Sequence, residues 1–144
     1  MNNPDLIFGS LFRAPDFPLP IIACFYTGPT APPYTAAMQR MPEPHLGAQF
    51  NRDFPELLSQ ALVENPAVHD GAIMLGRRNV EEPYRVTGWS YRLFPPKAGD
   101  DVINRGSAFN SCLAMSVQSS VDNLYLISKD GIFRFVEGTV KMLT

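Results

Sequence analysis

The sequence has few charged residues and no long apolar run. Charged side chains make up 18% of the 144 residues, and the formal net charge is −2. Binding nucleic acid through its phosphates needs a basic face, so this balance argues against bulk nucleic-acid binding but allows a site for one small anion. No apolar run approaches the roughly 18 residues needed to cross a bilayer. The first ten residues also lack the parts of a signal peptide. We therefore expect a cytoplasmic chain with no membrane partner.

Cysteine and histidine are also scarce. Cys24, Cys112, His45 and His69 are the only ones, and their spacing matches no metal site. We expect both thiols to be buried and unreactive. Hydrophobic residues make up 45% of the chain, which is typical of a globular domain long enough to bury a core.

Proline is unevenly distributed along the chain. Nine of the fourteen prolines precede residue 50, and proline breaks helices and central strands. We therefore expect residues 1–50 to be a proline-rich segment packed on a domain formed by residues 51–144. Within the segment, the apolar run 19–27 predicts a strand. The stretch 27–37 predicts a surface loop.

From residue 53 the pattern alternates between helices and strands. Asp53 is a candidate N-cap, with Pro55 and Glu56 in the first turn of a helix that ends near residue 65. A second helix should begin at Gly106. Strands are predicted at 72–77, 83–94 and 123–128, followed by a hairpin over 132–143 with its turn at Glu137-Gly138. This alternation predicts an α/β single domain with a mixed central β-sheet flanked by helices.

Three short turns carry polar residues that could bind a ligand. Asp70-Gly71 precedes a strand, so Asp70 could ligate a hard divalent cation and Gly71 could allow a close approach. An ordinary Asp-Gly turn is the alternative. Ser128 and Lys129 end another strand and could contact a base or phosphate, or simply form a hairpin turn.

The third turn is Gly106-Ser107. At a helix start it would expose backbone N–H groups and the positive end of the helix dipole, which favour an anion. Alternatively, Ser107 caps its own helix. Arg105 is the nearby cation.

On the strand predicted at 83–94, Arg85 and Arg92 flank Trp89 and Tyr91. This pattern suits either base stacking or a solvated strand face.

The order and spacing of these stretches resemble the diadenylate cyclase domain family, whose members join two ATP molecules into cyclic di-AMP. The resemblance covers residues 54–143. "LLSQALVENPAVHDGAIML" is similar to the family's helix and DGA motif, and "GSAFNSCLAMS" to its glycine-led helix start. "LYLISKDGIF" is similar to its strand ending in serine, two acidic residues and glycine. The resemblance implies a nucleotide site used with Mg²⁺ or Mn²⁺, in a homodimer whose protomers each bring one ATP.

The side chains that grip the ATP phosphates in the family are absent here. Its Arg-His-Arg falls on Ala108, Phe109 and Asn110, its first acidic residue falls on Lys129, and a later acidic residue falls on Val117. Charge-assisted hydrogen bonds to phosphate are about twice as strong as neutral ones, so the loss weakens any grip on a triphosphate. An inward-packed Phe109 would also be expected to plug the site.

Three functions remain open on this reading. The first is a non-catalytic, diadenylate-cyclase-like sensor of a nucleotide or cyclic dinucleotide in bacterial signalling. The second is an active cyclase or nucleotidyltransferase in which Asp70 holds the metal and Arg105 and Lys129 supply charge. The third is a structural module that keeps only the fold and binds a partner protein. The candidate nucleotide-binding residues are Asp70, Gly71, Ala72, Arg105, Gly106, Ser107, Asn110, Ser128 and Lys129.

Overall fold

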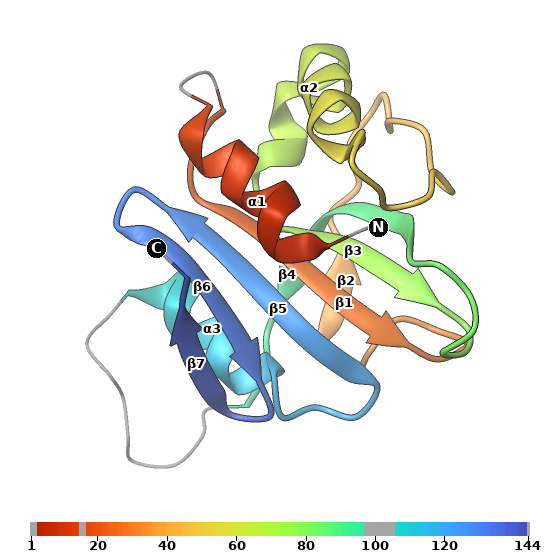
Figure 1. Cartoon of the computed structure of the whole chain (residues 1–144). Helices are drawn as coiled ribbons and strands as arrows, with labels where there is room; N and C mark the ends of the chain where they lie inside the picture. The colour runs from red at the N-terminus through yellow and green to blue at the C-terminus, as the bar shows by residue number, and fades with distance from the viewer. Residues whose placement is uncertain (1–2, 15–16, 97–105, 144) are drawn as a thin grey trace.

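Seven strands form one mixed sheet in the computed structural model, which describes residues 3–14, 17–96 and 106–143 (Figure 1). The strand order is β2-β4-β3-β1-β5-β6-β7; β1 and β3 run parallel, and every other neighbouring pair is antiparallel. The predicted α/β single domain with a mixed sheet and flanking helices is confirmed. The elements are α1 (Pro4–Arg13), β1 (Ile21–Thr27), β2 (Thr35–Ala37), α2 (Phe54–Glu64), a 3₁₀ turn (Pro66–His69), β3 (Ala72–Arg77), β4 (Arg85–Leu93), α3 (Ser107–Met115), β5 (Val121–Ser128), β6 (Gly131–Val136) and β7 (Thr139–Met142).

The sheet is covered on both faces, because side chains along its strands alternate between two cores. Phe25 on β1 packs in the core that contains Phe8 of α1 and Leu58 of α2. The preceding residue, Cys24, packs in the other core together with Cys112 of α3. In Figure 1, α1 lies in front of the sheet, on the face opposite α3. Within the described residues, no helix is long and apolar enough to cross a membrane.

The region before residue 50 contributes more regular structure than its prolines predict. The strand β1 lies between β3 and β5, so the sheet draws its strands from both sides of residue 50. The helix α1 was not predicted, although its signals are present: Asn3 accepts a hydrogen bond from the Asp5 N–H at 3.0 Å, and Pro4 stands in the first turn. The stretch expected to be a loop contains β2, which pairs with β4.

Most other predicted elements are confirmed, with one correction at a helix start. Asp53 stands at the N-cap of α2, but its side chain makes no capping bond. Its N–H instead donates to Asn51 Oδ1 at 2.9 Å. The hairpin turn lies at Glu137 and Gly138, whose φ angles of +48° and +81° suit a tight two-residue turn.

Candidate functional site

The three polar turns predicted from the sequence lie at one end of the sheet. The strand β3 begins there, the antiparallel β5 ends there, and α3 begins beside them. Two adjoining hollows open at this end and share Pro20, Ser107 and Ala108. We call them the Lys129 hollow, of about 480 Å³, and the Arg92 hollow, of about 360 Å³. Both volumes fall in the range of roughly 300–1,000 Å³ found for ligand pockets. The Lys129 hollow is also lined by Leu19, Gly106, Phe109, Leu126, Ser128, Lys129, Asp130 and Phe133, and the Arg92 hollow by Ile22, Met38, His69, Asp70, Gly71, Ala72, Tyr91, Arg92, Leu93 and Ser111.

Asp70 is held by a cation that the sequence analysis did not single out. Arg40 Nη2 lies 3.0 Å from Asp70 Oδ2, and Arg40 Nε donates to Ser90 Oγ at 3.0 Å. The Ser90 hydroxyl in turn donates to the Asp70 carbonyl oxygen. Asp70 is therefore bound through both its side chain and its backbone, while its side chain stays 74% exposed and lines the Arg92 hollow.

Gly71 is required by its surroundings as well as by its backbone conformation. Its φ is +93°, a region that L side chains rarely adopt. A Cβ on Gly71 would lie 2.6 Å from Met38 Cε and 2.7 Å from the Tyr91 carbonyl oxygen. The turn is thus packed directly against β4 and the segment before residue 50.

A bulge in β4 places Ser90 under this turn. The register between β3 and β4 shifts between Ala72 and Met74, and Ser90 has a φ of +58° and is completely buried. The Ser90 carbonyl accepts a hydrogen bond from the Met38 N–H at 3.0 Å. Bulges often redirect a side chain next to a functional site, and here the bulge aims a hydroxyl at Asp70 and Arg40.

Gly106 and Ser107 form the open side of the site. Gly106 has a φ of +92° and stands at the N-cap of α3, where no side chain makes a capping bond. The alternative that Ser107 caps its own helix is therefore wrong, since Ser107 is the first helical residue. Both residues are exposed and line the hollows, whereas Asn110 lines neither. Arg105 lies outside the described residues.

Phe109 does not plug the site as expected. It packs inward, with its ring centroid 5.5 Å from that of Phe133 and 5.0 Å from that of Phe135. Its side chain is 5% exposed and forms part of the floor of the Lys129 hollow, which stays open. The residue at the middle position of the lost motif therefore belongs to the core without closing the site.

The strand end at Ser128 adds a lysine to the rim of the hollow. Ser128 Oγ accepts a hydrogen bond from the Asp130 N–H at 3.1 Å, which fixes the turn. Lys129 and Asp130 are exposed and line the Lys129 hollow. Within the described part of the chain, Lys129 has no ion-pair partner.

The arginines and aromatic residues of β4 divide between the site and the scaffold. Arg92 lines the Arg92 hollow, with its guanidinium carbon 5.7 Å from the centre of the Phe94 ring. Arg85 points elsewhere and donates to the Gly47 carbonyl at 3.1 Å. Trp89 is buried and donates to the His45 carbonyl at 3.1 Å. Only Tyr91 and Arg92 of the aromatic and basic residues predicted on this strand reach the site.

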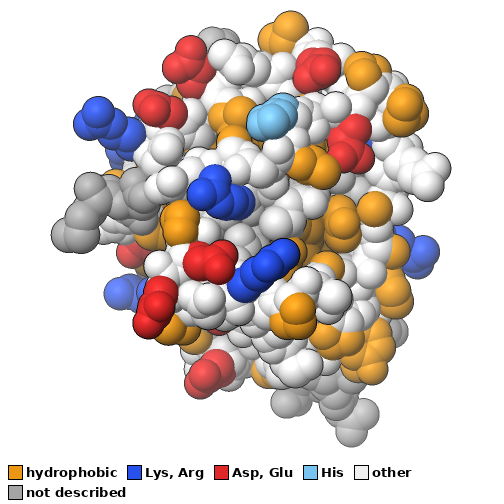
Figure 2. All heavy atoms as spheres, turned by 90° about the vertical axis from the view of Figure 1, so that its right-hand side faces the viewer, with side chains coloured by type: hydrophobic (Ala, Val, Ile, Leu, Met, Phe, Trp, Pro, Cys, Tyr) orange, Lys and Arg blue, Asp and Glu red, His pale blue; other side chains and the backbone are white. Residues whose placement is uncertain are grey.

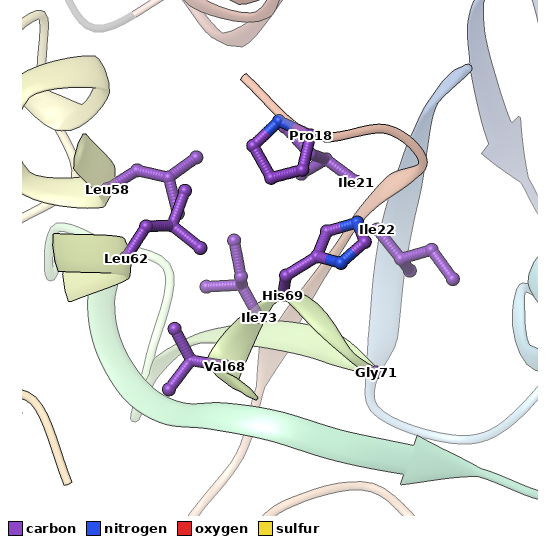
Figure 3. A pocket seen from close by; sticks show the side chains of 9 residues that line it. All are labelled: Pro18, Ile21, Ile22, Leu58, Leu62, Val68, His69, Gly71 and Ile73. Atoms are coloured by element: carbon purple, nitrogen blue, oxygen red, sulfur yellow. The ribbon is translucent and has the colours of Figure 1, made fainter. Parts of the chain in front are cut away.

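A third, much smaller cavity lies behind the Asp70-Gly71 turn (Figure 3). Its volume is about 10 Å³, close to the minimum for one water molecule. Apolar side chains from α2, β1 and β3 surround it, and His69 lines both this cavity and the Arg92 hollow. The buried Nε2 of His69 has no hydrogen-bond partner among the described residues. This cavity is too small for a ligand, so the inner side of the turn is essentially filled.

The cysteines do not supply a nucleophile to the site. Burial raises the pKa of the Cys24 thiol to about 12, and the Asp122 carboxylate adds to the rise. Burial likewise raises the pKa of Cys112. The thiolate is the reactive form, so both thiols are protonated and inert near neutral pH. The prediction of two buried thiols is confirmed.

A resident divalent metal does not fit the side chains described here. Within residues 3–14, 17–96 and 106–143, no group of three or more His, Cys, Asp or Glu could hold a metal ion. The candidate ligand Asp70 already pairs with Arg40.

In the view of Figure 2, basic and acidic side chains are interspersed, and the described residues on that face form no extended area of one charge.

Comparison with known proteins supports the fold and extends no further. No family model and no curated protein matches the sequence. Solved structures do match. A hypothetical membrane spanning protein from Bacillus cereus superposes with a TM-score of 0.60 and 14% identity, over 87% of this chain and 55% of that one. DacA from Staphylococcus aureus superposes with a TM-score of 0.55 and 14% identity, over 97% of this chain and 81% of that one. This chain thus spans about half the length of the Bacillus cereus protein. The chain has a diadenylate-cyclase-like fold.

Sequence reasoning missed Arg40 and Ser90. Arg40 lies in the proline-rich segment, 30 positions before its partner Asp70, and no local pattern connects the two. Ser90 sits within an apparently regular strand, where the bulge that turns it toward Asp70 leaves no clear signal in the sequence.

Proposed function

We propose that the paired hollows bind a nucleotide or a cyclic dinucleotide, and that this domain senses the ligand without converting it. One observation carries the proposal. Three turns that are far apart in sequence border two adjoining hollows on a diadenylate-cyclase-like fold. A fold alone does not imply a function, so the proposal rests on this site.

The lining of the hollows suits a base and a phosphate. The Lys129 hollow has an apolar floor that includes Leu126 and Phe133, with Ser107, Ser128 and Lys129 at its rim. A flat base can pack on such a floor, while the hydroxyls and the ammonium group bind polar atoms. The neighbouring Arg92 hollow offers a guanidinium for a phosphate oxygen.

The same lining argues against catalysis. Ala108 and Asn110 stand where the resembled family carries arginines, and Phe109 is part of the core. The described cations at the hollows are therefore too few to stabilise the charge that moves in phosphoryl transfer.

Thermal unfolding with a ligand panel tests the proposal. ATP, GTP and cyclic di-AMP would each be added with EDTA, with Mg²⁺ and with Mn²⁺. A ligand at 100 times its Kd adds about 2.7 kcal/mol to stability, which raises Tm by several degrees in a domain of this size. We expect such a shift with at least one ligand, and chromatography of the same sample should recover that ligand unchanged.

A blocking variant assigns the binding to the hollows. Ala108 is half-buried and borders both hollows, so Ala108→Trp should fill them and abolish the shift. Val63→Trp is the matched control, because Val63 is 83% exposed on α2 and lines neither hollow. The absence of a shift with every ligand at millimolar concentration would leave a fold used for protein contacts. Formation of a cyclic product would establish the active-enzyme alternative.

A further inference from the structure

The ion pair at Asp70 bears on how the site handles negative charge. Arg40 approaches Asp70 from the segment before residue 50, outside the stretch 54–143 whose sequence resembles the cyclase family. Its guanidinium is 3.0 Å from the Asp70 carboxylate and donates to Ser90 Oγ at the same distance. The cation is therefore directed at the one carboxylate of the Arg92 hollow.

The position of Arg40 is fixed by the backbone around it. Ser90 is fully buried in a left-handed conformation, and its hydroxyl links Arg40 to the Asp70 carbonyl. The Met38 N–H, two residues before Arg40, donates to the Ser90 carbonyl at 3.0 Å. Only 26% of the Arg40 side chain is exposed. Arg40 is thus held by an ion pair to Asp70 and a hydrogen bond to Ser90, and it is part of the site rather than a freely moving surface side chain.

A divalent ion at Asp70 would compete with this guanidinium for the carboxylate. Mg²⁺ at phosphate sites is usually held by one or two carboxylates together with waters and substrate phosphates, and the one carboxylate that Asp70 supplies is already paired with Arg40. Arg92 and Lys129 line the two hollows together with the carboxylates Asp70 and Asp130, and Arg40 adds a third cation through its ion pair with Asp70. Counted over these described residues, the site is positive by one charge without a metal.

We propose that Arg40 takes the place of a divalent metal ion at Asp70, so that the hollows bind their phosphate-bearing ligand without Mg²⁺ or Mn²⁺. The ligand part of this inference rests on the proposed nucleotide-binding function. The metal part concerns Asp70 alone and can be tested without any nucleotide.

The first measurement uses Mn²⁺ alone with the full chain, followed by electron paramagnetic resonance. We expect no stoichiometric Mn²⁺ binding that depends on Asp70. Binding of one Mn²⁺ per chain that Asp70→Asn removes would overturn the inference, whatever the outcome with nucleotides.

The second measurement is the affinity for ATP, GTP and cyclic di-AMP by calorimetry, in EDTA and in Mg²⁺. We expect Kd of the ligand that binds to change by less than about twofold between the two buffers. A loss of tenfold or more in EDTA, at roughly 1.4 kcal/mol per tenfold, would overturn the inference and leave the proposed function intact. If none of the three ligands binds in any buffer, the proposed function fails and the Mn²⁺ result alone decides the inference.

Two charge variants give effects of opposite sign. Asp70→Asn removes a negative charge beside the ligand and frees Arg40, so it should tighten binding by up to about fivefold, equally in EDTA and Mg²⁺. If Asp70 held a metal, the same variant would weaken binding, and only in Mg²⁺. Arg40→Gln leaves Asp70 uncompensated and should weaken binding by at least about fivefold. Glu56→Gln, on the exposed side of α2, changes the net charge equally to Asp70→Asn and should have no effect.

Discussion

Gly71 and Gly106 have almost the same φ angle, +93° and +92°, yet their described surroundings differ. Two atoms would lie within 2.7 Å of a Cβ on Gly71, whereas no described atom lies within 4 Å of one on Gly106. The first turn is fixed by packing against β4, whereas no described residue packs closely against the second. Among the described residues, the site therefore joins a closely packed wall to an open wall.

Gly71→Ala should cause the largest loss in the free energy of unfolding. The new methyl group would meet the Tyr91 carbonyl oxygen at 2.7 Å, and backbone cannot move aside as a flexible side chain can. Overpacking combined with the unfavourable φ should lower the free energy of unfolding by about 3 kcal/mol or more. Urea denaturation measures this loss. A loss below about 1 kcal/mol would mean that the first turn is no more rigid than the second.

Ser90→Ala should cause the second-largest loss in the free energy of unfolding. It removes the hydroxyl that connects Arg40 to the Asp70 carbonyl and leaves both groups short of a partner. We expect a loss of about 2 kcal/mol in the free energy of unfolding. Ser90→Gly separates the two contributions, because it also loses the hydroxyl but relieves the left-handed strain at this position. It should be more stable than Ser90→Ala by about 1 kcal/mol. Equal stability of the two variants would indicate that Ser90 is not strained.

Gly106→Ala tests the open wall. The φ of +92° is unfavourable for alanine, but nothing described around Gly106 prevents the turn from relaxing. We expect a loss of about 1 kcal/mol, clearly smaller than at Gly71. The free energy of ligand binding, measured in the same preparation, should fall by more than the free energy of unfolding. The reason is that a relaxed turn no longer presents Ser107 to the hollows. A loss of stability as large as that of Gly71→Ala would remove the distinction between the two walls.

The smallest effect on stability is expected for Lys129→Ala. Lys129 is exposed and forms no ion pair with a described residue, so the free energy of unfolding should change by less than about 0.5 kcal/mol. Lys129 lines the Lys129 hollow, so the affinity for the nucleotide should fall when its charge is removed, and the fall should shrink as salt is added. Asn110→Ala is the control, since Asn110 lines neither hollow. A larger loss of affinity from Asn110→Ala than from Lys129→Ala would relocate the site.

Local patterns in the sequence predict most of the fold. The apolar runs of β3 and β5, the proline in the first turn of α2 and the hairpin at Glu137-Gly138 each arise from residues that are neighbours in the chain. The strand β2 was missed because three residues among prolines carry too weak a pattern. The helix α1 carries local signals in Asn3 and Pro4, but the many prolines that follow it favour irregular structure over the whole segment.

The residues of the candidate site likewise divide into those with a local sequence pattern and those without one. Asp70, Gly106 and Ser128 could be found because each belongs to a short stretch with a recognisable pattern. Arg40 and Ser90 could not, because their roles depend on a strand bulge and on contacts across 30 and 20 positions of sequence. An inward-packed Phe109 was expected to close the site. Phe109 does pack inward, but its ring lies at the bottom of the Lys129 hollow without filling it.

The central position of β1 also determines when the sheet can form during synthesis. Ile22 pairs with Ala72 on one side and with Leu126 on the other, so β1 leaves the ribosome well before either of its partners. Pairing over such sequence separations slows folding, because long loops must close before the contacts form. Until β5 emerges, one long edge of β1 stays unpaired, and an unpaired edge readily pairs with other chains. Nascent chains of this protein should therefore depend on chaperones until nearly all of the domain has been made.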